Sequence, residues 1–281
     1  MPDSTQNFSF ELFPPKTEKG FDKLKNTVRD LNAYQPDFFS VTYGAGGSTQ
    51  ERTFETVDWL RNEGIQTAPH LSCIGSSREE IIDILQHYQS QGIKRIVALR
   101  GDLPSGAGLG SLGDLNFANE LVSLIKSEFN DAFHLEVAAY PETHPQAANA
   151  QSDFDNFVRK VKAGADSAIT QYFYNADAYF AFVDSCQKAD INIPIVPGIM
   201  PITNYTQLAR FSDACGAEIP RWIRKRLQGY GDDLESIRAF GQEVVVDMCQ
   251  RLLDNQVPGL HFYTMNQSAA TLSIWHHLQR R

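Results

Sequence analysis

The stretch FSFELFPPK, residues 8–16, gives the first indication of the fold. Large apolar residues alternate in it with Ser9 and Glu11, the two-residue period of a β-strand. Pro14 and Pro15 have no backbone N–H to donate, so strand pairing must end before them. The segment therefore predicts a strand with an apolar face, a polar face and a carboxylate near its end. Burial of a carboxylate costs free energy, so a reason for Glu11 must be sought elsewhere in the chain.

Seven further runs of this kind follow, and helical patterns separate them. The predicted strands are 8–13, 38–44, 67–74, 95–102, 134–140, 167–174, 193–200 and 259–266. Apolar residues at three- and four-residue spacing predict the helices, and Ser77 with Glu80 forms a capping box before one of them. Alternating strands and helices form parallel sheets through right-handed crossovers. Eight such units in about 250 residues predict an α/β fold, a single (β/α)8 TIM barrel.

One interval departs from this regular alternation. Residues 201–258 separate the seventh and eighth predicted strands and are long enough for two or three helices. We therefore expect an extra helical segment between strands 7 and 8. Because no linker, low-complexity segment or duplication interrupts the chain, residues 1–281 are expected to form one catalytic barrel domain.

Composition and charge exclude several classes of protein. The net charge of −9 disfavours a nucleic-acid binder, and we interpret the basic cluster Arg221, Arg224, Lys225 and Arg226 as a solvated helix face. No apolar run approaches the ~18 residues of a membrane span, and the N-terminus lacks the regions of a signal peptide. We expect a soluble, cytoplasmic protein with neither a nucleic-acid nor a membrane partner.

The cysteines do not indicate a disulfide framework or a metal site. The four lie at positions 73, 186, 215 and 249, without a CxxC pair. His70 and Cys73 are close in sequence, but residues three apart in a strand point to opposite faces. We expect no metal.

Polar residues recur at the predicted carboxyl ends of the strands, where barrel enzymes place their chemistry. They are Glu11, Thr42, His70, Arg100, Asp102, Tyr140, Gln171, Thr264 and Asn266. Ser9 and Glu11 share the face opposite Phe8, Phe10 and Leu12, so Glu11 should point into the barrel. Two acidic residues at one barrel mouth suit acid–base chemistry or a cationic intermediate. A structural Glu11 paired with a neighbouring cation is the alternative.

Two loop and helix motifs bear on cofactor binding. YGAGGST, residues 43–49, lacks the final glycine of a dinucleotide fingerprint, since Thr49 stands there. We interpret it as a tight loop that caps a helix. Asp153, Asn156, Arg159 and Lys160 recur at helical spacing and are either surface charge pairs or a binding site for a phosphorylated cofactor.

Eight motifs in order along nearly the whole chain carry a family resemblance. They are FELFPPK, SVTYGAGGSTQERT, APHLSCIG, IVALRGDLP, AAYPETHPQA, ITQYFYN, PGIMPITNY and FYTMN. Together they closely resemble the bacterial methylenetetrahydrofolate reductases, which are FAD-containing (β/α)8 barrels. One such string would be weak, whereas eight in sequence are specific.

The resemblance implies a flavin-dependent oxidoreductase with a ping-pong reaction. NADH, or less often NADPH, reduces the FAD and leaves, and 5,10-methylenetetrahydrofolate then binds in the same place. Transfer of a hydride gives 5-methyltetrahydrofolate, which supplies methyl groups for methionine synthesis. Glu11 matches the family's general acid, and Asp102 matches the acidic residue near flavin and folate. Members of the family form homo-oligomers, which is the expectation for this chain.

The resemblance also assigns binding positions. The FAD-binding positions are Thr42, Tyr43, Ala45, His70, Arg100, Gly101, Asp102, Phe117, Ala118, Tyr140, His144, Ala147, Asp153, Asn156, Arg159 and Lys160. The substrate-binding positions are Asp102, Gln171, Gln207, Phe211 and Gln267. Three features depart from the family pattern. The loop 104–118 is longer, Phe117 replaces a tyrosine, and Gln267 replaces an arginine suited to the folate glutamate tail.

The expected role of Glu11 carries a condition. To donate a proton near neutral pH it needs a raised pKa, which desolvation under bound folate would provide. Two alternatives remain open from the sequence. One is another flavin- or pterin-dependent barrel enzyme, and the other is a catalytically idle folate-binding barrel.

Overall fold

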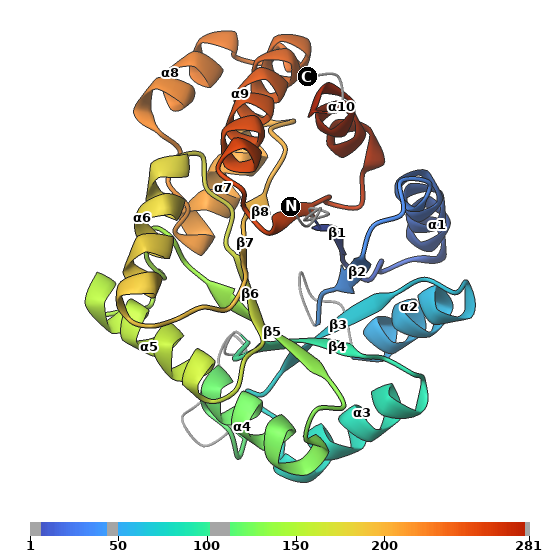
Figure 1. Ribbon diagram of the computed structural model, residues 1–281. Coiled ribbons are helices and arrows are strands. Elements are labelled where there is room, and N and C mark those ends of the chain that lie inside the picture. The colour runs from blue at the N-terminus through green and yellow to red at the C-terminus, as the bar shows by residue number, and fades with distance from the viewer. Residues whose placement is uncertain (1–6, 44–49, 102–112, 279–281) are drawn as a thin grey trace, which may run out of the picture.

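Parallel strands surround a common centre and helices cover them on the outside (Figure 1). The computed structural model describes residues 7–43, 50–101 and 113–278. The strands are β1 Asn7–Leu12, β2 Phe38–Val41, β3 Thr67–Ser72, β4 Arg95–Leu99, β5 His134–Ala139, β6 Ser167–Thr170, β7 Ile195–Val196, β8 Gly198–Ile199 and β9 Gly259–Tyr263. The helices are α1 Glu18–Asn32, α2 Gln50–Asn62, α3 Arg78–Ser90, α4 Ala118–Phe129, α5 Ala150–Lys162, α6 Ala176–Lys188, α7 Tyr205–Cys215, α8 Arg221–Tyr230, α9 Leu234–Asp254 and α10 Ser268–Leu278. The prediction of a (β/α)8 barrel is confirmed.

The strand order is β7-β6-β5-β4-β3-β2-β1-β9-β8, and neighbouring strands of the described residues pair in parallel. β7 pairs with β6, whereas β8 pairs with β9, so the segment that holds both short strands joins the two edges of the sheet.

The prediction of one continuous strand over 193–200 was wrong. Pro197 interrupts it because proline has no N–H for the ladder, although its carbonyl still accepts a hydrogen bond from His261 N at 3.0 Å.

Tyrosine hydroxyls strengthen this closing seam, which we define as residues 195–200. The Tyr179 hydroxyl donates to Ile195 O at 2.7 Å, and the Tyr174 hydroxyl donates to Met200 O at 3.1 Å. Across the seam, the Tyr263 hydroxyl donates to Thr170 O at 2.8 Å. Each bond satisfies a backbone carbonyl, so phenol side chains supplement the short ladder at this position.

Glycine is required within the seam. A Cβ atom at Gly198 would lie 2.2 Å from Thr170 O and 2.6 Å from a ring carbon of Tyr263. Both distances are far below a normal contact, so only a residue without a side chain allows β6 and Tyr263 to approach this closely.

The two faces of each strand have different environments. On β1, Phe10 and Leu12 face the helices, and the Phe10 ring lies 5.6 Å from that of Phe39 and 5.9 Å from that of Phe262. Inside the barrel a smaller apolar cluster contains Phe38, Ala68, Val97 and Ile169. The alternation predicted from FSFELF therefore places Ser9 and Glu11 inward.

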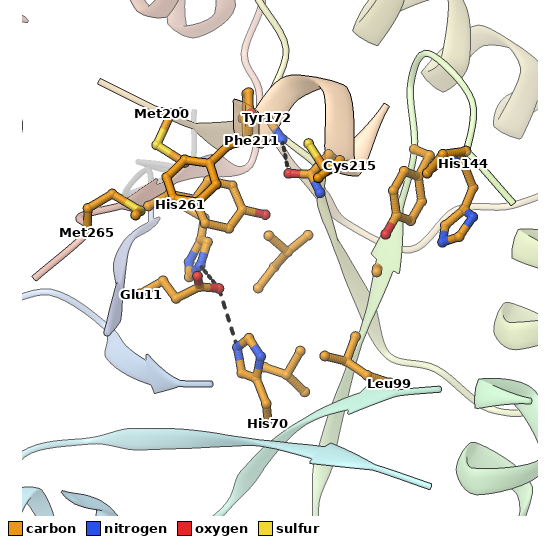
Figure 2. A pocket seen from close by; sticks show the side chains of 18 of the residues that line it. Glu11, His70, Leu99, His144, Tyr172, Met200, Phe211, Cys215, His261 and Met265 are labelled. Atoms are coloured by element: carbon orange, nitrogen blue, oxygen red, sulfur yellow. Dashed lines mark hydrogen bonds and ion pairs between the residues drawn. The ribbon is translucent and has the colours of Figure 1, made fainter. Parts of the chain in front are cut away.

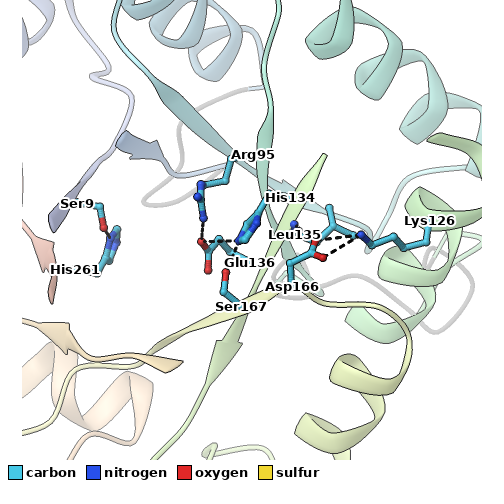
Figure 3. A network of polar contacts seen from close by, with 9 residues as sticks. All are labelled: Ser9, Arg95, Lys126, His134, Leu135, Glu136, Asp166, Ser167 and His261. Atoms are coloured by element: carbon cyan, nitrogen blue, oxygen red, sulfur yellow. Dashed lines mark hydrogen bonds and ion pairs between the residues drawn. The ribbon is translucent and has the colours of Figure 1, made fainter. Parts of the chain in front are cut away.

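A charged cluster occupies the barrel interior at the amino-terminal ends of β4, β5 and β6 (Figure 3). Arg95 forms an ion pair with Glu136, which is 2 % exposed, and His134 Nε2 lies 3.5 Å from the same carboxylate. His134 also contacts the Ser167 hydroxyl at 2.5 Å. Burial by itself raises the pKa of Glu136, but His134 and Arg95 outweigh this effect and hold the pKa below its usual value.

The interval between the seventh and eighth predicted strands contains α7, α8 and α9, in agreement with the expected extra helical segment.

The predicted strands were too long at their carboxyl ends. The strand predicted at 38–44 ends at Val41, that at 95–102 ends at Leu99, and that at 167–174 ends at Thr170. Single backbone hydrogen bonds to the neighbouring segment continue just past two of these ends, from Thr42 N to Leu12 O at 2.9 Å and from Gln171 N to Ala139 O at 2.7 Å. No helix in the described part of the chain is both long and apolar enough to cross a membrane.

Candidate active site

A cavity of about 440 Å³ opens at the carboxyl ends of the strands (Figure 2). Its walls come from β1, β3, β4, β6 and β9, from the rim after β5, and from α7. Six of the predicted site residues line it: Glu11, His70, Tyr140, His144, Gln171 and Phe211. These residues are far apart in sequence, and the barrel brings them to one space.

Glu11 lies between two buried histidines. Its Oε2 atom is 3.6 Å from His70 Nε2 and 4.0 Å from His261 Nε2, and its side chain is 19 % exposed. Burial lowers the pKa of His70 to about 4, partly opposed by the nearby Glu11 carboxylate, so the His70 imidazole is neutral at pH 7. Among the described residues, the ion-pair contacts of Glu11 are with these two imidazoles and not with an arginine or a lysine.

The tip of β1 is fixed by residues that follow β9. Thr264 Oγ1 donates to Glu11 O at 2.6 Å. Asn266 accepts from Phe13 N at 3.0 Å and donates to Phe13 O at 2.8 Å through the same side-chain amide. The sequence placed Thr264 and Asn266 among the polar rim residues, and the structure shows them holding the backbone that carries Glu11.

Gly101 allows a close turn after β4. Its φ is +85°, and a Cβ atom there would lie 1.8 Å from Ser72 Oγ. Ser72 Oγ donates to Arg100 O at 2.8 Å, while the Arg100 guanidinium binds Asn116 O and Gln146 Oε1. The turn therefore directs the Arg100 side chain along the rim toward the loop after β5.

The predicted polar residues of α5 have distinct settings. Lys160 reaches back to Ala138 O, and burial lowers its pKa to about 8 despite the opposing charge of Asp153. Asp153 accepts from His144 N at 2.8 Å. Arg159 pairs with Asn156 at 2.6 Å on the exposed surface. Lys160 thus connects α5 to β5, and Asp153 connects it to the loop that carries His144, whereas Arg159 and Asn156 face solvent.

The remaining predicted positions lie around the same rim. Thr42 is buried, and its Oγ1 has no hydrogen-bond partner among the described residues; burial raises the pKa of the neighbouring Tyr43. Phe117, which is 55 % exposed, precedes Ala118 at the start of α4. Ala147 N bonds to His144 O at 2.9 Å. Among the predicted FAD-binding positions that the structure describes, His70, Tyr140 and His144 line the cavity.

Some predicted residues are not brought into the cavity wall. Gln207 and Gln267 are exposed and do not line the cavity. Asp102 and Ala45 lie outside the described residues, as do the loop 44–49 and most of the long loop 104–118.

Sequence reasoning missed several residues of the wall. The cavity is also lined by Tyr172, Met200, Cys215, His261, Tyr263 and Met265. Strand alternation in GLHFY offered a signal for two of these, because His261 and Tyr263 share one face of β9. Cys215 lies in α7, and strand alternation says nothing about a helix. The described residues contain no group of three or more His, Cys, Asp or Glu side chains that could hold a metal ion.

The fold and the site together define a barrel enzyme with acid–base groups at the carboxyl end of its strands. The methylenetetrahydrofolate reductase family model matches residues 2–279. The chain is 41% identical over 273 residues to the 5,10-methylenetetrahydrofolate reductase of Escherichia coli (strain K12), covering 97% of this chain and 90% of that protein. The chain therefore belongs to the methylenetetrahydrofolate reductase family, whose members are oxidoreductases.

Two further comparisons extend this result. The chain is 38% identical over 279 residues to methylenetetrahydrofolate reductase (NADH) 1 of Arabidopsis thaliana, covering 95% of this chain and 47% of that protein. Among solved structures it resembles an uncharacterized protein from Clostridium thermocellum that binds two copies of 5-methyl-5,6,7,8-tetrahydrofolic acid. The TM-score is 0.68 at 16% identity, over 98% of this chain and 96% of the other. At that identity the likeness supports the barrel fold alone.

Proposed function

We propose that this protein reduces 5,10-methylenetetrahydrofolate to 5-methyltetrahydrofolate, with NADH or NADPH as reductant and FAD as resident cofactor. One observation carries the proposal within the family assignment. An inward carboxylate, Glu11, shares a single cavity with Gln171 and Phe211, the positions expected to contact folate or nicotinamide. One binding place for both substrates suits a ping-pong reaction, because the first product must then leave before the second substrate binds.

The rim residues fit a flavin dinucleotide. Thr42 Oγ1 and His70 Nε2 are buried polar atoms without hydrogen-bond partners among the described residues, and such atoms are usually satisfied by a ligand or water. Arg100, Arg159 and Lys160 supply cations suited to a pyrophosphate, and Gly101 lets the backbone approach the ligand closely. FAD held by these residues would supply the hydride-transfer chemistry between the nicotinamide and the folate.

The protein's own groups supply the acid–base chemistry. Glu11 would donate a proton to the folate and so open the five-membered ring to a reactive iminium. Water is largely excluded at this position, because the Glu11 side chain is only 19 % exposed before any ligand binds. Asp102, which lies outside the described residues, would stabilise the resulting cation. Residues 1–281 would act as one catalytic domain in a cytoplasmic homo-oligomer that supplies methyl groups for methionine synthesis.

An anaerobic absorption spectrum of the purified protein tests the proposal. We expect a flavin band that NADH bleaches and that methylenetetrahydrofolate restores, which records both half-reactions in one sample. A protein that remains colourless after incubation with FAD would contradict the proposal and favour an idle folate-binding barrel. A flavin band that the folate does not restore would favour another flavin-dependent barrel enzyme.

The variant Glu11→Gln separates the two half-reactions. It keeps the shape of the side chain but cannot donate the proton, so bleaching by NADH should persist while restoration by the folate falls at least about 100-fold. The matched control is Glu128→Gln, which removes a surface carboxylate paired with Arg78 and should change neither step. Equal loss of both half-reactions in Glu11→Gln would argue against its role as the acid.

A further inference from the structure

Ser9, His261 and Glu11 form a row of polar groups inside the barrel. Ser9 and Glu11 are two residues apart on β1 and share its inward face, and His261 lies opposite Ser9 on β9. The Ser9 hydroxyl and His261 Nδ1 are 2.7 Å apart, and His261 Nε2 lies 4.0 Å from Glu11 Oε2. Ser9 is 4 % exposed and His261 is 1 % exposed, so water does not compete for these contacts.

The His261 ring has little freedom to turn. It stacks on Phe38 with ring centroids 6.1 Å apart, and it meets Tyr263 edge-on at 5.4 Å. The Ser9 hydroxyl fixes its Nδ1 end, so the Nε2 end must face Glu11 (Figure 2).

This geometry favours one tautomer. A carboxylate oxygen only accepts hydrogen bonds, so an Nε2 atom that faces it is best protonated. His261 Nδ1 then carries no proton, and it accepts a hydrogen bond from the Ser9 hydroxyl. We infer that Ser9 and His261 are positioning residues for Glu11: Ser9 holds the His261 ring in this orientation, and His261 directs an N–H toward the carboxylate that remains once Glu11 has donated its proton.

The inference rests on the proposed function, because the acid step at Glu11 belongs to that reaction. The tautomer of His261, however, can be tested without turnover. The titratable groups that face Glu11 are His70 from β3, His261 and Tyr263 from β9, and Tyr140 after β5. Burial keeps His70 neutral and raises the pKa of Tyr263 well above its usual value. Near neutral pH, neither residue therefore adds a charge that would mask the effect of His261.

The test uses Ser9→Ala, with Ser40→Ala as its matched control. Ser40 lies opposite Glu11 on β2, is fully buried, and has an Oγ without a hydrogen-bond partner among the described residues. Nitrogen NMR of the imidazoles should show His261 with its proton on Nε2 in the unaltered protein and in Ser40→Ala, and a mixture of tautomers in Ser9→Ala.

The second readout is the pH profile of the folate half-reaction. Ser9→Ala removes the directed donor to the carboxylate, so the alkaline limb of this profile should move up by about one pH unit in Ser9→Ala alone. Reduction by NADH should not change. A proton on Nδ1 of His261 in the unaltered protein, or an equal effect of both alanine variants, would overturn the inference.

Failure of the proposed function gives a different pattern. If the unaltered protein does not reduce methylenetetrahydrofolate, the spectra refute that function. The imidazole NMR of the three proteins then still decides whether Ser9 holds the His261 ring with its Nε2–H toward Glu11.

Discussion

A neutral imidazole in the cavity wall makes stability depend on pH at the scale of a single residue. Burial lowers the pKa of His70 from 6.5 to about 4. Between these values the unfolded chain binds a proton that the folded chain does not, so stability falls as pH falls through this window. The full effect for one such residue is on the order of 3 kcal/mol.

We therefore predict that His70→Gln flattens the acid dependence of stability. Urea unfolding at pH 7 and pH 5 should show a loss for the unaltered protein that exceeds the loss for His70→Gln by about 2 kcal/mol. The control is His87→Gln, because this side chain is 40% exposed on α3. Equal slopes for the unaltered protein and His70→Gln would contradict the prediction.

How far a residue's role could be predicted depended on the distance of its partners in sequence. The inward direction of Glu11 follows from alternation within six residues of β1. The Ser9–His261 contact joins residues 252 positions apart, and no local pattern encodes it. The family resemblance named Glu11 and Gln171 but not His261, because it assigned roles only to ligand contacts.

At the scale of elements, the ends of β1 and β9 are joined by side chains rather than by a longer ladder. The Asn266 amide makes two hydrogen bonds to the Phe13 backbone, just beyond the last paired residues. This contact fixes the direction in which the chain leaves β1, and therefore the position of Glu11.

We predict that Asn266→Ala loosens this junction. Two lost hydrogen bonds should cost about 1–3 kcal/mol in the free energy of unfolding, measured with urea. The folate half-reaction should slow about tenfold through misplacement of Glu11, while reduction by NADH stays within about twofold. Asn255→Ala removes a comparable amide that bonds Arg251 O at the exposed end of α9, and it serves as the control. A similar result for both variants would show that Asn266 has no special influence on Glu11.

Prediction of the elements succeeded where capping residues and a regular apolar period marked them. It failed where a proline or a polar residue interrupted the pattern. Ser77 and Glu80 form the capping box that the sequence predicts. Pro197 divided the predicted seventh strand, although its sequence is apolar throughout the region. Helix α10 was not predicted because its buried face includes Thr271 beside Ile274 and Trp275, and a polar residue obscures the helical period.

At the scale of the whole molecule, the barrel carries an ion pair in its interior, at the amino-terminal ends of β4 and β5. Glu136 is almost completely buried, so its charge depends on Arg95 and His134. Removal of one partner leaves a buried charge without compensation, which costs more than the pair itself contributes.

We predict that Arg95→Met destabilises the protein by about 3 kcal/mol at pH 7, measured by urea unfolding. The double variant Arg95→Met/Glu136→Leu should recover most of this loss, because it leaves no buried charge. Arg78→Met breaks the exposed pair with Glu128 and should cost less than about 1 kcal/mol. A double variant less stable than Arg95→Met would contradict this account. Since the pKa of Glu136 is lowered, its contribution should disappear as pH falls below about 4.5.

The global fold could be predicted because eight repeated units each carry the same local signal. The interior charges could not, since Arg95 lies on β4 while His134 and Glu136 lie on β5, and these strands become neighbours only after the barrel forms. Local patterns predicted the barrel and the direction of Glu11, and only the assembled sheet showed which polar groups meet inside it.

The tyrosines of the closing seam set an alkaline limit for the barrel. Burial raises the pKa of Tyr174, Tyr179 and Tyr263 above that of an exposed phenol. Above about pH 10 the unfolded chain releases these three protons while the folded chain retains them, so each phenol costs about 1.4 kcal/mol per pH unit. The three together make denaturation by base steep, because ionisation breaks the hydrogen bonds that Tyr174 and Tyr179 donate to the seam and that Tyr263 donates to β6.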